Sequence, residues 1–109
     1  MLGKEISVIG AEEFSMGFRV IGIEETFNYT GKEGAEKLRE MIKSDRYSLI
    51  ICHSDIRDQL PENEKLEVDR MDNPIVLFIS PKEEEEDVYS MAKRILGVDI
   101  RNLDYGTNL

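Results

Sequence analysis

Segments of strand character alternate with segments of helical character along this chain, and this alternation limits the folds that it can adopt. Apolar or alternating patterns predict strands over Lys4–Gly10, Glu25–Tyr29, Tyr47–Cys52 and Ile75–Ile79. A helical pattern follows each of these segments. Such an order is typical of a parallel sheet whose strands are joined by right-handed helical crossovers. We therefore predict a small, doubly wound α/β fold around a four-stranded parallel sheet.

The composition of the strands indicates their order in the sheet. The third segment is apolar without a break from Leu49 to Cys52, as expected of a central strand that is covered on both faces. The second segment alternates Thr26 and Asn28 with Phe27 and Tyr29, so it is half exposed and suits an edge. We predict the order 2-1-3-4, as in flavodoxin-like or receiver-like sheets.

Helical spacing and helix signals divide the rest of the chain. Helices are predicted over Glu12–Gly22, from Gly31 to near Ser44, and over a region ending at Asp72 that Pro61 interrupts. A last helix over Glu84–Leu96 has acidic residues at its start, and Gly97 follows it. We expect residues 1–81 to form the α/β domain and residues 82–109 a C-terminal helix and tail.

Charge and composition exclude several classes of function. The net charge of −9 and the pI of about 4.6 disfavour binding to nucleic acid or to an anionic membrane surface. The apolar runs are far shorter than the ~20 residues of a membrane helix, and residues 1–5 carry no secretory signal, so we expect a cytoplasmic protein without membrane insertion. The single cysteine, Cys52, and the single histidine, His53, argue against a disulfide and a metal site.

The loops at the carboxyl ends of the strands carry little that predicts catalysis. The loop Gly10–Glu13 lacks the closely spaced glycines of a phosphate-binding turn and has two carboxylates instead. Cys52 and His53 are neighbours on an extended strand, so they should point to opposite faces and cannot pair as nucleophile and base. We expect no catalytic residue, no cofactor and no metal.

Two alternative functions remain open. Glu12 and Glu13 could act with Asp55 and Lys82 as a magnesium-dependent phosphoacceptor site, as in receiver-like signalling domains, although the expected acceptor position holds Cys52 and His53. The chain could also be a small enzyme or phosphocarrier that uses the Cys52 thiol, although a small core residue is the simpler interpretation.

The helix predicted over Glu12–Gly22 is apolar on two opposite faces. At about 100° per residue, one stripe holds Phe14, Phe18 and Ile21, and the opposite stripe holds Met16 and Val20, with Arg19 and Glu12 between them. One stripe can serve the core of the domain. The other indicates either a protein partner or deeper burial of the helix.

Four blocks of the sequence resemble the F subunit of the archaeal and vacuolar rotary ATPases, also called A-type or V-type ATP synthases. The blocks are Ile6–Gly10, Gly17–Ile23, Asn73–Pro81 and Ile95–Ile100. The Gly-Phe-Arg step that leads to Gly22-Ile23 and the Gly-Val-Asp-Ile end are the most specific. The chain departs from the usual pattern at Ala11-Glu12, Val20-Ile21 and His53-Ser54.

The resemblance implies a non-catalytic subunit of the central rotor stalk, peripheral on the cytoplasmic face of the membrane. It implies binding to the coiled-coil D subunit and coupling of ATP synthesis or hydrolysis to proton or sodium transport. It also implies a C-terminal helix that can change position and touch the catalytic A/B head. The residues expected at these contacts are Met16, Phe18, Arg19, Val20, Ile23, Ile95, Leu96, Val98 and Ile100.

Overall fold

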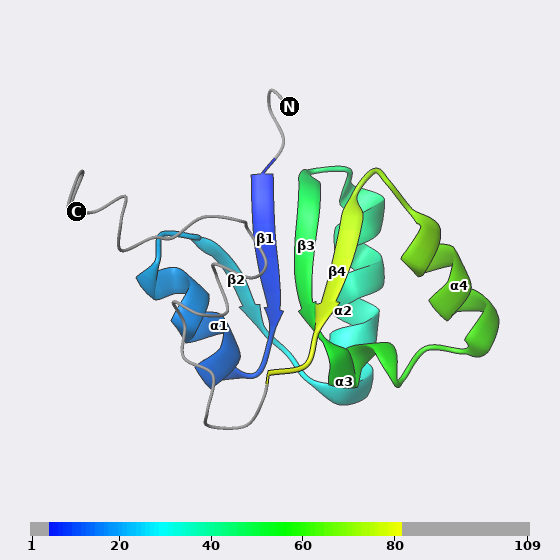
Figure 1. Ribbon diagram of the computed structural model, residues 1–109, viewed down its shortest axis with the longest axis horizontal. Helices are drawn as coiled ribbons and strands as arrows, with labels where there is room; N and C mark the ends of the chain where they lie inside the picture. The colour runs from blue at the N-terminus through cyan, green and yellow to red at the C-terminus, as the bar shows by residue number, and fades with distance from the viewer. Residues whose placement is uncertain (1–4, 82–109) are drawn as a thin grey trace, which may run out of the picture.

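The domain is built on a parallel sheet of four strands (Figure 1). The computed structural model describes residues 5–81 of the chain, so the helix predicted over Glu84–Leu96 and the division at residue 82 lie outside the described residues. The strands are β1 (Glu5–Gly10), β2 (Glu25–Asn28), β3 (Tyr47–His53) and β4 (Ile75–Ile79). They are parallel and ordered β2-β1-β3-β4, which confirms the predicted sheet and strand order.

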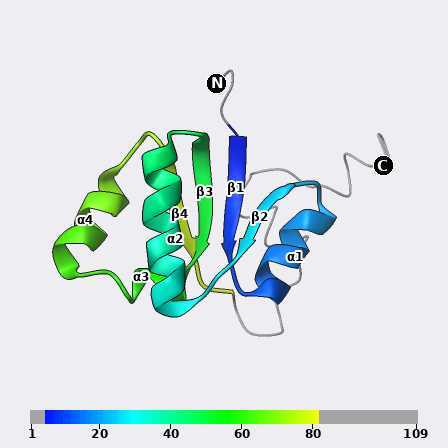
Figure 2. The same cartoon turned by 180° about the vertical axis from the view of Figure 1, so that it is seen from behind.

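The helices connect the strands and cover the sheet from both sides. Helix α1 (Glu12–Val20) lies on one face, and α2 (Gly31–Ser44), α3 (Ser54–Arg57) and α4 (Glu62–Arg70) lie on the other (Figures 1 and 2). The region predicted as one interrupted helix is therefore two helices, because Pro61 is extended and precedes α4 as its N-cap. Helix α1 ends two residues before the predicted limit, since Gly22 follows with a φ of 111°.

Two apolar clusters stabilise the fold, one on each face of the sheet. The larger cluster lies under α2, α3 and α4 and includes Leu38, Ile50, Cys52 and Ile56. The smaller cluster lies on the α1 face and consists of Val8, Phe14, Phe18, Ile51 and Ile79. Because Ile50 and Ile51 are both fully buried on opposite faces, β3 is the central strand that its unbroken apolar run predicts.

Helices α2 and α3 meet at a glycine. A Cβ atom on Gly34 would lie 2.6 Å from Cδ1 and 2.7 Å from Cγ1 of Ile56, a side chain that is fully buried. These distances are shorter than van der Waals contact, so the two helices could not approach as they do with a larger residue at position 34. Gly34 thus sets the depth at which α2 packs beside α3.

We predict that Gly34→Ala lowers the free energy of unfolding by about 1–2 kcal/mol, because overpacking costs more than the gain in helix propensity. The loss should shrink in an Ile56→Val background, where the nearest methyl group is absent. Urea unfolding of the wild type, the two single variants and the double variant measures the loss in each background. The exposed substitution Glu36→Ala on the same helix is the control, and an equal effect of Gly34→Ala in both backgrounds would contradict the contact.

Candidate functional site

The outer face of α1 carries an exposed apolar stripe. Met16 is 46% exposed and Val20 is 70% exposed, whereas Phe14 and Phe18 on the inner face are 7% and 2% exposed. The two phenylalanine rings pack edge to face with their centroids 5.2 Å apart. The two-faced pattern of this helix is confirmed, and the second stripe is not absorbed into the core of the domain.

A buried serine fixes the position of α1 on the sheet. Ser15 is fully buried, and its hydroxyl has two carbonyl acceptors for its single proton, Gly10 at 3.4 Å and Phe27 at 3.3 Å. These carbonyls belong to β1 and β2, so the serine ties the helix to two strands. Ser15 was not predicted as a contact to the sheet, although a polar residue next to Phe14 on the inner side of an amphipathic helix is a signal for such a bond.

Arg19 and Ile23 flank the exposed stripe. The Arg19 Nη1 atom donates a hydrogen bond to the hydroxyl of Thr26 in β2 at 3.1 Å, which holds the guanidinium over the edge of the sheet. Ile23 is half-buried and packs against the smaller cluster. Together Met16, Arg19, Val20 and Ile23 form the surface that we name the α1 patch.

One predicted contact residue belongs to the core instead. Phe18 is 2% exposed because its ring faces the sheet and packs on Phe14, so it is unavailable to a partner at this surface. This corrects the expectation that Phe18 lies at an interface. The other expected contacts, Ile95, Leu96, Val98 and Ile100, lie outside the described residues.

The carboxyl ends of the central strands hold the residues that the alternative functions require. Cys52 is fully buried in the larger cluster, and this burial raises the pKa of its thiol well above the usual range. His53 contacts the ring of Phe14 on the other face of the sheet, with centroids 5.1 Å apart. Cys52 and His53 therefore point to opposite faces, as predicted, and a thiolate nucleophile is disfavoured.

The carboxylates considered for a phosphoacceptor site lie on two different helices. Glu12 and Glu13 are exposed in the first turn of α1, whereas Asp55 lies in α3. The backbone N–H of Asp55 donates to His53 Nδ1 at 3.1 Å, so His53 acts as the N-cap of α3. Lys82 lies outside the described residues. Within residues 5–81, no cluster of three or more metal-ligating side chains is found.

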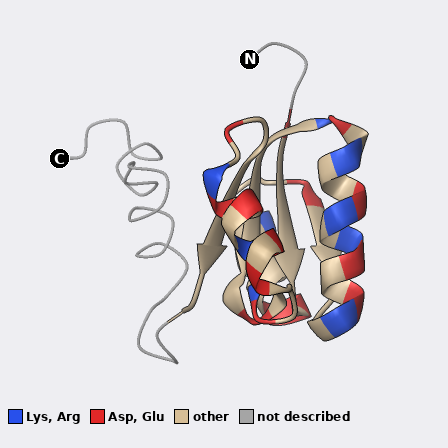
Figure 3. Ribbon diagram, turned by 90° about the vertical axis from the view of Figure 1, so that its right-hand side faces the viewer, with Lys and Arg blue, Asp and Glu red and all other residues tan. Residues whose placement is uncertain are grey.

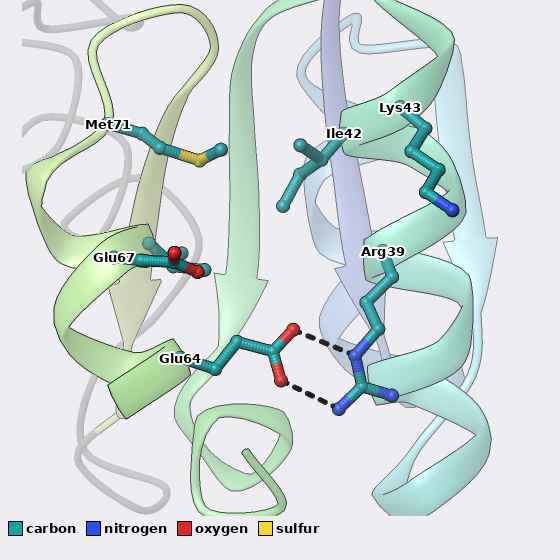
Figure 4. Close-up of a pocket in the computed structure, with 7 residues that line it drawn as sticks. Arg39, Ile42, Lys43, Glu64, Glu67 and Met71 are labelled. Atoms are coloured by element: carbon teal, nitrogen blue, oxygen red, sulfur yellow. Dashed lines mark hydrogen bonds and ion pairs between the residues drawn. The ribbon is translucent and has the colours of Figure 1, made fainter. Parts of the chain in front are cut away.

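A groove opens on the opposite face of the sheet, between α2 and α4 (Figure 4). Its apolar wall consists of Ile42, Val68 and Met71, and its volume is about 470 Å³. Val68 belongs to the larger cluster, and Ile42 and Met71 pack against that cluster while remaining partly exposed. The apolar core is thus accessible from solvent at this point.

An ion pair joins the two sides of the groove. Nε and Nη2 of Arg39 in α2 donate to the two carboxylate oxygens of Glu64 in α4 at 2.8 and 2.9 Å. The hydrogen bonds from Arg39 hold the pKa of the Glu64 carboxyl below its usual value of 4.5. Such two-point pairs have a fixed geometry, so this one sets the separation of the helices where it forms.

No helix among the residues that the structure describes is long and apolar enough to cross a membrane.

The chain matches the family model described as ATP synthase (F/14-kDa) subunit over residues 6–95. It is 34% identical over 100 residues to the F subunit of the A-type ATP synthase of Thermoplasma acidophilum, covering 90% of this chain and 96% of that protein. It is 33% identical to the corresponding F subunit of Thermoplasma volcanium, covering 87% and 93% of the two chains. The crystal structure of the F subunit of the V-type ATP synthase from Archaeoglobus fulgidus matches with a TM-score of 0.63 and 22% identity, over 72% of this chain and 99% of that one. This last match shows that the fold is shared.

We predict that the Arg39–Glu64 pair makes stability depend on pH. Because the folded state lowers the pKa of Glu64, the pair stabilises the domain above the usual pKa of 4.5, and the contribution is lost as the pH falls through the lowered value. Glu64→Gln should cost up to about 1 kcal/mol near pH 7, a modest value because both side chains are partly exposed. It should cost nearly nothing at about pH 3.

Urea unfolding at several pH values measures this difference. Glu67→Gln, an exposed carboxylate in the same helix, is the matched control. The same pH dependence in wild type and Glu64→Gln would show that the ion pair contributes nothing to stability.

Proposed function

Because the chain belongs to the family of ATP synthase F subunits, we propose that it is a non-catalytic rotor subunit of an A/V-type ATP synthase and that it binds the coiled-coil D subunit of the central stalk. The observation that carries this proposal is the exposed apolar stripe of Met16 and Val20 on α1. Each side chain gains about 1.5–3 kcal/mol when it is fully transferred from water into an apolar contact. A coiled-coil partner offers long helices with apolar side chains for such a contact.

The α1 patch is suited to bind a rotating partner because the helix behind it is firmly attached. Its inner face is anchored by the Phe14–Phe18 packing and by the buried Ser15 hydroxyl. Arg19, held beside the stripe by Thr26, adds a cation that can meet a carboxylate of the partner. A load applied to the patch therefore reaches the sheet through close packing rather than through a loose loop.

In this role the domain adds to the rotor by shape and packing. Torque would pass between the ion-driven membrane ring and the head that forms or hydrolyses ATP. The choice between proton and sodium would be made in the membrane ring and not in this domain. The protein would lie on the cytoplasmic face of the membrane without inserting into it. The acidic surface and the net charge of −9 agree with contact to protein rather than to anionic lipid.

We further propose that residues 82–109 contact the catalytic A/B head through Ile95, Leu96, Val98 and Ile100. This contact would modulate turnover independently of the D subunit. The apolar positions of this segment, Val88, Met91, Ala92 and Ile95, have the spacing of one helix face.

We predict that Met16→Asp combined with Val20→Asp reduces affinity for the D subunit by at least about 100-fold, because two unpaired carboxylates would have to be buried in the contact. Both positions are exposed in the domain, so its free energy of unfolding should change by less than about 1 kcal/mol. Titration of the labelled coiled-coil partner and urea unfolding measure the two quantities.

Leu66→Asp is the matched control, because Leu66 is 54% exposed on α4, on the other face of the sheet. It should leave binding unchanged. If the double variant unfolds, the Met16 and Val20 stripe belongs to the core. If it folds and still binds the D subunit, the interface lies elsewhere.

A chain that ends at Pro81 should bind the D subunit within about twofold of the full chain, because the α1 patch lies entirely within residues 5–81. The ATP hydrolysis rate of the complex assembled with this chain should differ from that of the intact complex. Loss of binding on truncation would show that residues 82–109 make the main contact with the D subunit. An unchanged ATP hydrolysis rate would contradict the proposed contact of these residues with the head.

A further inference from the structure

The groove between α2 and α4 has features that the proposed contact of α1 does not use. The two surfaces lie on opposite faces of the sheet (Figures 1 and 2), so one straight helix bound at α1 cannot also occupy the groove. The apolar residues of the groove, Ile42, Val68 and Met71, are contributed by both sides, and the side chains of Ile42 and Met71 point toward each other across it (Figure 4).

The two rims of the groove have opposite charges. Arg39 and Lys43 lie one helical turn apart on α2, and Glu64 and Glu67 lie one turn apart on α4. In Figure 3, basic and acidic residues are interspersed along the ribbon of α2. Arg39 and Glu64 pair with each other at one end of the groove. One turn further, Lys43 and Glu67 are exposed, and neither has an ion-pair partner among residues 5–81.

This charge distribution selects the kind of occupant. A phosphate or other anion would be attracted by Lys43 and repelled by Glu67, and a metal ion would meet the reverse arrangement. The groove is instead complementary to an apolar surface with an acidic residue on one side and a basic residue on the other. Helices of coiled coils have this surface, because an apolar seam runs between flanking positions that often hold glutamate and lysine.

We propose that the α2–α4 groove is a second docking site, which takes an amphipathic helix from another protein of the complex. The apolar seam of that helix packs on Ile42, Val68 and Met71, its acidic flank faces Lys43, and its basic flank faces Glu67. The inference uses the proposed function only for the statement that the chain works inside a multi-subunit complex. It is independent of the α1 patch.

Single-cysteine labelling in the assembled complex tests the docking site. The native Cys52 is fully buried and should react slowly, so introduced thiols can be followed against it. Glu67→Cys reports on the groove, Val20→Cys reports on the α1 patch, and Glu40→Cys on the other flank of α2 is the control. Each variant is labelled with a maleimide as the free chain and in the purified ATP synthase.

The proposal predicts that assembly slows the labelling of Glu67→Cys by at least about tenfold, while Glu40→Cys reacts at a similar rate in both states. Equal rates at Glu67→Cys would overturn the second docking site. Protection at Val20→Cys tests the α1 contact separately. If only Glu67→Cys is protected, the α1 contact is overturned and the groove is supported. If only Val20→Cys is protected, the groove is overturned and the α1 contact is supported.

A photo-crosslinking residue in place of Lys43 then identifies the occupant in the same complex. The expected product joins this position to a helical segment of another protein of the complex that carries acidic residues near the crosslink. A product with lipid, with a second copy of this chain, or with no protein would overturn the proposal. As a charge test, Lys43→Glu should slow the association of this chain with the rest of the complex about threefold to tenfold. Glu40→Lys, on the other flank of α2, should not slow it.

Discussion

The double-sided burial of the central strands is the constraint on which the rest of this structure depends. Ile50 and Ile51 are neighbours in β3, point to opposite faces, and are both fully buried, and Val8 and Ile9 do the same in β1. A sheet of this kind is stable only when helices cover both faces, because each exposed apolar face would cost about 25 cal/mol per Å² in contact with water. The chain therefore places α1 on one face and α2, α3 and α4 on the other. Both candidate interaction surfaces are consequences of how these helices are placed.

The strand order could be predicted because the properties that determine it are local. An unbroken apolar run identifies β3 as central, and alternation identifies β2 as an edge strand. The outer stripe of α1 could also be predicted, since Met16 and Val20 lie opposite Phe14 on a regular helix. Phe18 was assigned wrongly because a motif resemblance says which residues recur and not which way each ring points. The groove could not be predicted, because it depends on α3 and α4 being separate helices and on Arg39 and Glu64, which are 25 positions apart.

The exposed residues of α1 differ in kind from the other side chains of that helix. Phe14, Ser15 and Phe18 have contacts within the domain that account for them, through packing or hydrogen bonds. Met16 and Val20 have most of their surface in water, so the fold gains little from their apolar character. The residues at the carboxyl ends of the strands show the reverse situation, because Cys52 and His53 are explained by burial and by helix capping. The outer face of α1 is therefore one surface that packing within the described residues does not explain.

The two proposed docking surfaces lie on opposite faces of one sheet, and this arrangement would suit a rotor subunit. The α1 patch and the α2–α4 groove are separated by the sheet itself, whose strands are linked by backbone hydrogen bonds and whose two faces are closely packed. Close packing on both faces would allow a displacement at one surface to reach the other. The Arg39–Glu64 pair links α2 and α4 across the groove in the absence of a partner. If the proposed helix binds there, a groove that is already formed would spare it the cost of separating the two helices, so more of the apolar gain would appear as affinity.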